Sequence, residues 1–281
     1  MKLPIKPLAI WGIAREIRTA SEDVEPLVVA GAADTAGRLV EAFRAGAEPA
    51  FVLDLSGREL TREEVEGANV LVYAIEGEAP SDADERTLRL ADRHDVDPVC
   101  VHVRERPNEP RDIPYVLATD VIAVAPGEEL PLKRIAARVA ARVGDDGYLL
   151  ASKVPALRHA ICEHIVRHFS RQNGVLAAAI FIPGADFPVL MLNQIRMVLR
   201  LAAAHGEEIG ARRALELLPL LGAGLGFREV ARQAVGFVPV LGWAIQGGIA
   251  LAGTRAVGEA AIVYFEALAS RQHKNAVRSR S

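Results

Sequence analysis

The feature that most constrains the fold is a change of sequence pattern near residue 145. Before that point, short apolar runs alternate with polar segments that have helical periodicity. After it the strand-like runs disappear, and long helical runs of Ala, Leu, Val, Ile and Gly follow. Alternating strands and helices are typical of an α/β layer structure. The sequence therefore predicts an α/β part followed by an all-α part.

The α/β part contains five nearly continuous apolar runs, as expected for strands buried on both faces of a parallel sheet. These runs are residues 26–31, 50–55, 69–75, 98–103 and 121–125. Helices are predicted between and after them, at residues 35–45, 81–94 and 131–143. Ser81 suits the N-cap of the second helix, and Pro131 suits the first position of the third. The pattern predicts a doubly wound, mostly parallel five-stranded sheet.

The chain of 281 residues divides into four predicted segments. They are an N-terminal extension at 1–25, the α/β domain at 26–147, a helical domain at 148–270 and a basic, disordered tail at 271–281. The apolar run at 8–14 is interrupted by Arg15, and no cleavage pattern follows it. It therefore predicts a short amphipathic helix, packed on the body or lying on a membrane surface, rather than a signal peptide.

Charge and cysteine usage exclude some partners. The net charge of −3 gives no general reason to expect a nucleic acid. Cys100 and Cys162 lie far apart in apolar settings, which is typical of buried free thiols in a reducing cytoplasm. His164 and His168 share one helix face, but no third ligand follows at a telling spacing, so we predict no metal site.

Residues 28–39, VVAGAADTAGRL, are similar to the start of a phosphate-binding loop. If Gly37 is aligned with the second glycine of G-x-x-x-x-G-K-[ST], Arg38 takes the place of the lysine and Leu39 that of the metal-binding hydroxyl. A leucine cannot bind a metal, and Asp34 adds negative charge where phosphate would lie. Gly37 and Arg38 therefore mark a remnant nucleotide loop, which an ordinary strand–turn–helix would explain about as well.

The order of the following motifs resembles Era/Der-type GTPases of the TRAFAC class. Asp54-Leu-Ser-Gly57 resembles their D-x-x-G, and the segment EEVEGANVLVYAIEGEAPSDADERTL resembles the strand and acidic helix after it. The last strand, with VIAVAPGEELPLKRIAARV, resembles their carboxyl-terminal end. The resemblance implies a P-loop GTPase-like fold in which Asp54 would lie near Mg²⁺ and Gly57 near the γ-phosphate.

The departures from this pattern predict a pseudo-GTPase without a cofactor. Arg38 and Asp54 are 16 positions apart, which leaves no room for the first switch and its antiparallel strand. Arg104-Glu-Arg-Pro stands where the guanine-reading N-K-x-D would be. Too many of the groups that position and neutralise phosphate are missing for GTP hydrolysis. Without the switch strand, the order 2-1-3-4-5 also fits a phospho-receiver, although Gly31-Ala32 and Glu76-Gly77 replace its acidic residues.

The helical part resembles the GTPase-associated helical domain-of-unknown-function family 697, which includes YcjF-like proteins. The features that carry the resemblance are Ile182-Pro183, Asp186, Gln194, His205-Gly206, Pro239-x-x-Gly242 and Gly258 with Tyr264-Phe265. Together the two resemblances cover residues 26–268. We expect Asp186 to cap a helix, although inside a membrane such a charge would be functional.

Residues 233–254 form an uncharged stretch of 22 residues, and about 20 apolar residues span a bilayer as a helix. Pro239 and several glycines interrupt the stretch. A buried hairpin of a soluble domain and a membrane-inserting hairpin both fit this pattern. Small residues recur at i+4 in two series, Ala244, Gly248, Ala252 and Ala250, Thr254, Gly258, as in closely packed helix pairs. The predicted membrane or helix-packing positions are Gly242, Trp243, Gly247, Gly248, Gly253 and Gly258.

Three functional hypotheses follow. In the first, the chain is a non-enzymatic docking or scaffold protein with an unidentified protein partner. Its helical domain self-associates and lies on, or inserts into, the cytoplasmic face of the inner membrane. In the second, it is a soluble switch in which Arg38 substitutes for lysine and GTP with Mg²⁺ still binds. In the third, it is a soluble protein-interaction scaffold.

Overall fold

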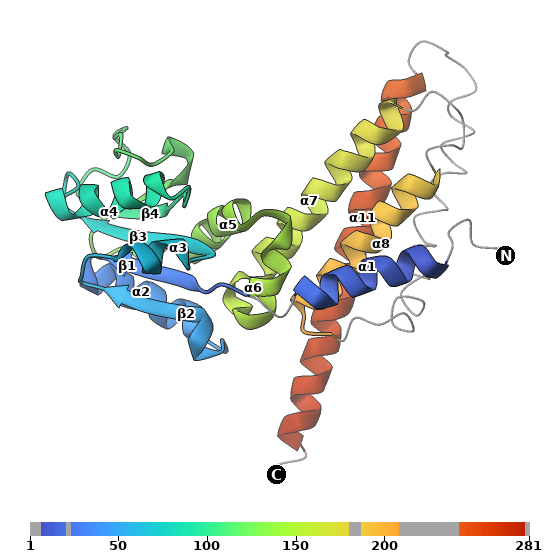
Figure 1. Cartoon of the computed structure of the whole chain (residues 1–281), viewed down its shortest axis with the longest axis horizontal. Helices are drawn as coiled ribbons and strands as arrows, with labels where there is room; N and C mark the ends of the chain where they lie inside the picture. Colours follow the sequence, from blue (N-terminus) through green and yellow to red (C-terminus); the bar gives the residue numbers. More distant parts are fainter. Residues whose placement is uncertain (1–6, 21–23, 180–186, 208–241, 279–281) are drawn as a thin grey trace. The chain divides into compact units, whose positions relative to one another are not determined.

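The computed structural model describes residues 7–20, 24–179, 187–207 and 242–278 (Figure 1). The chain divides into two compact units, one of residues 23–161 and one of residues 1–22 with 162–281. The first unit is α/β and the second is helical, as the sequence pattern predicts. Asp186 and residues 233–241 of the uncharged stretch lie outside the described ranges.

The α/β unit is built on a five-stranded sheet in the order β2-β1-β3-β4-β5, and every neighbouring pair is parallel. The strands are β1 (Leu27–Gly31), β2 (Val52–Ser56), β3 (Val70–Glu76), β4 (Val99–Val103) and β5 (Val121–Val124). The predicted parallel sheet and its order 2-1-3-4-5 are confirmed. β1 and β3 are buried on both faces almost throughout, which explains their continuous apolar runs.

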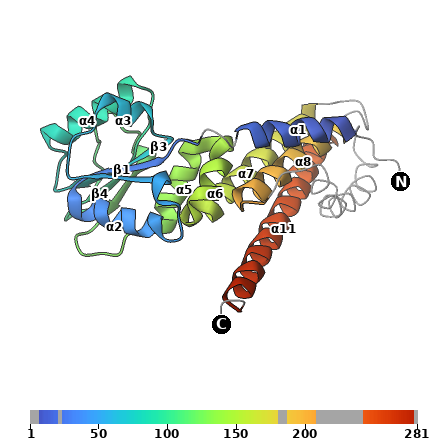
Figure 2. The same ribbon diagram turned by 60° about the horizontal axis from the view of Figure 1, so that its bottom comes forward.

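Helices cover both faces of this sheet (Figure 2). α3 (Arg62–Glu66) and α4 (Asp82–Arg93) cover one face, over an apolar cluster that includes Val65, Leu71 and Leu88. α2 (Ala33–Arg44) and α5 (Leu132–Val143) pack on the other. A turn at Gly144–Gly147, α6 (Tyr148–Lys153) and the first residues of α7 (Pro155–Ala179) complete the unit.

The helix boundaries differ slightly from those predicted. Ser81 caps α4 in a capping box with Asp84, as expected. Pro131 is the N-cap of α5 rather than its first residue. α2 begins at Ala33, two residues before the predicted start, and α3 was not predicted.

The helical unit consists, in its described part, of α1 (Pro7–Ala20), α7 from residue 162, α8 (Phe187–Ala204) and α11 (Gly242–Arg278). α8 packs against both α1 and α11. The amphipathic helix predicted near the N-terminus is α1, whose inner face buries Ile10, Ile13 and Ile17. The unit has an apolar core with one buried polar cluster, described below.

Candidate functional site

The carboxyl ends of β1 and β3 meet at the point where the strand order reverses. In open α/β sheets, ligands bind outside the carboxyl ends of the strands at such a point. Gly31 ends β1 and pairs in register with Ala74 of β3, and Glu76 ends β3. This edge is therefore the first place to look for a nucleotide site.

The turn between β1 and α2 is too short to form a phosphate cradle. Only Ala32 separates the last strand residue from the first helical residue. The Ala32 N–H donates to the carbonyl oxygen of Ala74 at 2.9 Å. The Ala36 N–H donates to the carbonyl oxygen of Ala32, also at 2.9 Å. Gly31 has φ +97°, and a Cβ there would overlap the carbonyl oxygen of Ala74. The close approach of β3 thus requires glycine at this position and occupies the N–H that follows it.

The structure places the remnant-loop residues inside α2. Gly37 faces open space in the middle of the helix, and Leu39 is buried. Arg38 is exposed, and its Nη2 donates to the carbonyl oxygen of Glu128, in the loop after β5, at 3.0 Å. The structure therefore does not bring the Arg38 side chain to the N-terminus of the helix, where a phosphate-binding lysine would act.

A carboxylate of the protein itself occupies that N-terminus. Glu76 Oε1 accepts the backbone N–H of Thr35 at 3.2 Å and the Thr35 hydroxyl at 2.7 Å. Helix N-termini favour anions because their first N–H groups lack intrahelical partners and the helix dipole is positive there. The sequence pattern predicted that the third strand ends near Glu76. It did not predict that Glu76 bonds to Thr35, which lies 41 positions earlier.

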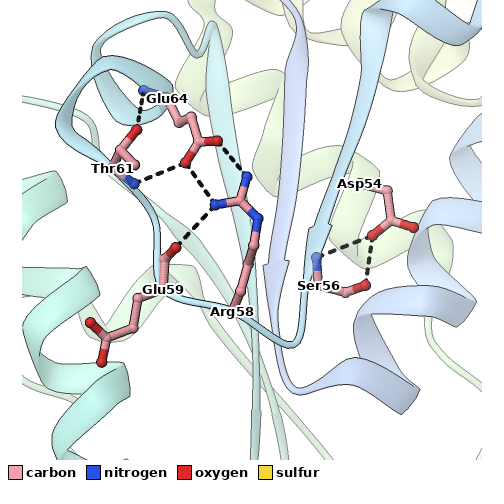
Figure 3. Close-up of polar contacts among 6 residues, drawn as sticks. All are labelled: Asp54, Ser56, Arg58, Glu59, Thr61 and Glu64. Carbon is pink, nitrogen blue, oxygen red and sulfur yellow. Dashed lines mark hydrogen bonds and ion pairs between the residues drawn. The ribbon is translucent and has the colours of Figure 1, made fainter.

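Of the D-x-x-G residues, Asp54 lies in the middle of β2, opposite Val29 of β1, and Gly57 directly follows the carboxyl end of β2. Asp54 accepts the Ser56 hydroxyl at 2.6 Å and the Ser56 N–H at 3.1 Å (Figure 3). These two bonds lower the pKa of Asp54 below its ordinary value. Gly57 has φ +72°, and its N–H donates to the carbonyl oxygen of Gly31 at 2.8 Å. The two residues thus stabilise the end of β2 and its contact with β1.

A polar cluster after Gly57 fixes the start of α3 (Figure 3). Thr61 and Glu64 form a capping box, in which the Thr61 N–H donates to Glu64 Oε2 at 2.9 Å. Arg58 donates to the same Oε2 at 3.0 Å and also pairs with Oε1. The Arg58 guanidinium, followed by the Thr61 N–H, lowers the pKa of Glu64 to about 2. These contacts tie Arg58 and Thr61, which precede α3, to Glu64 in its first turn.

Two buried side chains at the carboxyl end of β4 bond to neighbouring loops, His102 to the loop after β3 and Arg104 to the loop after β4. His102 Nε2 lies 2.7 Å from the carbonyl oxygen of Gly77, so this nitrogen must carry the proton and donate. Burial is the main reason that the pKa of His102 is lowered, and the imidazole is therefore neutral near pH 7. Arg104 is 4% exposed and donates to the carbonyl oxygens of Pro107 and Glu109. Arg104 thus holds the backbone of the loop that follows β4.

Metal and thiol chemistry have little support in the part of the chain that the structure describes. No group of three or more His, Cys, Asp and Glu residues there is arranged to hold a metal ion. Cys100 and Cys162 are buried and are not joined in a disulfide, and burial raises the pKa of Cys100. A buried thiol with a raised pKa is a packing residue rather than a nucleophile.

In the helical unit, glycines bring α7 and α11 into close contact. A Cβ at Gly247 would lie 2.9 Å from the carbonyl oxygen of Gly174, and one at Gly258 would lie 2.5 Å from Val166 Cγ2. Gly248 and Gly253 face open space. Only one of the two predicted i+4 series, that of Thr254 and Gly258, therefore follows the buried face of α11. Gly242 and Trp243 lie in the first turn of the helix.

Four polar side chains link α7, α8 and α11 within the core. Asn173 Nδ2 donates to Thr254 Oγ1 at 2.9 Å and to the carbonyl oxygen of Leu190 at 3.3 Å. Asn193 Nδ2 donates to Asn173 Oδ1 at 3.0 Å, and Gln194 Nε2 donates to Thr254 Oγ1 at 3.1 Å. Asn173 and Thr254 are almost fully buried, so these bonds satisfy groups that water cannot reach.

Comparison with protein families covers this part of the chain. Residues 145–280 match the family described as "Domain of unknown function (DUF697)". This stretch is a DUF697 domain. The searches of curated proteins and of solved structures gave no match. The DUF697 domain contains α6, α7, α8 and α11, together with the glycine contacts and the polar cluster.

Among the described residues of the DUF697 domain, one helix is long and apolar enough to cross a membrane. This candidate span runs from Gly247 to Arg271 within α11, and 39% of its most apolar window is buried inside the protein. Buried core helices of soluble proteins meet the same criterion. The span also carries an exposed ion pair, in which Arg255 Nε donates to Glu259 Oε1 at 2.7 Å. Length and composition alone therefore do not make α11 a transmembrane helix.

Proposed function

We propose that this chain is a non-catalytic docking protein of the cytoplasmic membrane face. Its sheet domain is a pseudo-GTPase that takes up no nucleotide and presents a fixed surface to a protein partner. Its helical unit, made of residues 1–22 and 162–281, holds the chain at the membrane. The single observation that carries the proposal is the Glu76 carboxylate at the N-terminus of α2.

The contact between Glu76 and Thr35 opposes phosphate binding in two ways. It uses a first-turn N–H and the hydroxyl that would otherwise face the ligand, and it places negative charge where the phosphate would lie. The one-residue turn adds a third obstacle, because the Ala32 N–H is bonded to Ala74. A phosphate would have to displace these bonds and overcome like-charge repulsion.

The alternative of a soluble GTP switch requires Arg38 to act as the phosphate lysine. Arg38 lies in the second turn of α2, and its guanidinium bonds to the loop after β5. In a phosphate loop the lysine reaches the β- and γ-phosphates across the helix N-terminus. The position of Arg38 therefore favours the pseudo-GTPase over the switch.

The exposed charges of α11 favour a position on the membrane surface over a helix that crosses it. Arg255 and Glu259 are about 60% exposed within the candidate span. Placing a charged side chain at the centre of a bilayer costs about 2.5–3.5 kcal/mol per residue on insertion scales. The exposed charges of α11 fit a soluble scaffold equally well, which is the second candidate function. Fractionation distinguishes the soluble scaffold from the membrane-surface protein.

Nucleotide binding is tested by thermal unfolding of the full chain with and without Mg²⁺-GTP. We expect the same Tm in both, because a ligand raises Tm only when it binds the folded state. Arg38→Ala serves as the matched variant and is expected to behave like the wild type. A GTP-dependent rise in Tm that Arg38→Ala abolishes would overturn the pseudo-GTPase proposal in favour of the switch.

Membrane location is tested by fractionation of the untagged protein, followed by washes of the membrane pellet. We expect the protein in the pellet and its release by high salt or carbonate, as for a surface-bound protein. Retention after carbonate would mean that part of the DUF697 domain inserts. A fully soluble protein would establish the scaffold alternative instead.

A further inference from the structure

The α1 helix presents two chemically different faces. Its inner face packs against α8 and buries Ile10, Ile13 and Ile17. Trp11, Arg15 and Arg18 are exposed and follow one another at i, i+4 and i+7, so they form one stripe along the outer face. Because the inner face is packed against α8, the stripe lies on the side of α1 that faces away from the core of the helical unit.

Trp11 is the most unusual member of the stripe. Its side chain is 57% exposed, although tryptophan is highly buried on average in folded proteins. Its ring combines an apolar body with one N–H donor, and such rings are enriched at the level of lipid headgroups. An exposed tryptophan on a packed amphipathic helix therefore indicates a surface that contacts something partly apolar.

The charges beside Trp11 identify the partner as anionic. Arg15 and Arg18 form no ion pair with any residue that the structure describes. Glu16, the acidic residue nearby, has a partner within the unit, since its Oε2 lies 3.6 Å from Arg196 Nη2 of α8. The first 20 residues of the sequence also contain Lys2 and Lys6, and Glu16 is their only acidic residue.

We infer that the outer face of α1 binds an anionic lipid surface, with Trp11 at the headgroup level and Arg15 and Arg18 against lipid phosphates. This inference rests on the membrane location proposed above and names the element that makes the contact. Tryptophan is enriched at the headgroup level, and arginines near an anionic leaflet are attracted to it, so the affinity should depend on anionic lipid. On this inference, α1 attaches the chain to the membrane, and α11 does not insert.

The test is sedimentation of the full chain with phosphatidylcholine vesicles, with and without phosphatidylserine. Each basic residue near such a surface contributes about 1 kcal/mol, so Arg15→Gln with Arg18→Gln should weaken binding by roughly 30-fold. The control is Arg134→Gln with Arg138→Gln, which removes two exposed arginines from α5. In a Trp243→Phe background, Trp11 emission should shift to shorter wavelength only with anionic vesicles.

The outcomes distinguish this inference from the proposed function. Binding to anionic vesicles that the α1 pair weakens as expected, and the α5 pair leaves unchanged, would establish α1 as the contact. Equal binding by wild type and α1 pair would overturn the inference and leave the membrane location standing. No wild-type binding to either vesicle would overturn the inference and count against the membrane location. If Trp11→Ala instead lowered the mass of an oligomer, the stripe would be an interface between copies.

Discussion

Glu76, the last residue of β3, accepts both the backbone N–H and the hydroxyl of Thr35 in the first turn of α2. The contact joins two adjacent strands through the helix that follows one of them. It gives α2 an N-terminal acceptor from another element, because its own N-cap, Ala32, has no side chain that can accept a bond. In this protein the anion preference of a helix N-terminus thus supports the fold.

The first prediction concerns this cap. Glu76→Ala should lower the free energy of unfolding by about 1 kcal/mol, as loss of an N-terminal cap does. Glu76→Gln keeps an oxygen acceptor and should lower the free energy of unfolding by less than Glu76→Ala does. A double-mutant cycle with Thr35→Val, followed by urea unfolding, measures the coupling. Strictly additive effects of the two substitutions would show that the two side chains do not support each other.

The second prediction separates glycines that pack from glycines that do not. Gly247→Ala would place a methyl group 2.9 Å from the carbonyl oxygen of Gly174, so it should destabilise the helical unit by about 1–3 kcal/mol. Gly248→Ala, at the next position, faces open space and should stabilise the helix by about 0.5–1 kcal/mol. Thermal unfolding of both variants shows whether each substitution raises or lowers the stability of the protein. Equal effects would mean that α7 and α11 do not approach each other in this register.

The third prediction is a pH dependence. The pKa of Glu64 is lowered from its ordinary value of 4.5 to about 2, chiefly by Arg58. A carboxylate with a lower pKa in the folded state stabilises the fold fully above its unfolded pKa and loses that stabilisation as the pH falls. The stability difference between wild type and Glu64→Gln should therefore be constant above pH 4.5 and shrink toward pH 2. A difference that is independent of pH would contradict the ion pair.

The fourth prediction concerns His102. Because burial lowers its pKa below 6.5, the unfolded state binds a proton more readily than the folded state does. The contribution of the neutral imidazole to stability is therefore full above pH 6.5 and decreases as the pH falls below it. NMR titration of the ring should give a midpoint below 6.5, with exposed histidines of the denatured chain as the reference. A midpoint at 6.5 or higher would mean that burial does not control the titration of the ring.

The sheet could be predicted from the sequence because its strands are buried on both faces, and continuous burial leaves continuous apolar runs. The strand order followed from the spacing of Arg38 and Asp54, which left no room for an additional strand. α3 was missed because it has five residues and only Val65 is buried, so it has no apolar period. Its capping box, Thr61 with Glu64, was the available signal.

The details of the nucleotide-loop region could not be predicted, because they depend on a neighbouring strand. The positions of Gly37 and Arg38 were matched to a motif by spacing, but the start of α2 is determined by the contact of Gly31 and Ala32 with Ala74. The two small-residue series of α11 likewise appear equivalent in sequence. Gly174 and Val166 of α7 distinguish them, and no local pattern reveals which helix face those residues meet.

The buried cluster around Asn173 has a consequence for motion in the helical unit. Successive residues of an α-helix are turned by about 100° and raised by 1.5 Å, so a slip of α11 by one residue would carry the Thr254 hydroxyl away from both of its donors. The amides of Asn173 and Gln194 would then be buried without that acceptor, at a cost of about 1–3 kcal/mol for each group. The same slip would also move Gly247 and Gly258 away from their close contacts with α7. The three amides and one hydroxyl therefore favour a single axial register of α7, α8 and α11.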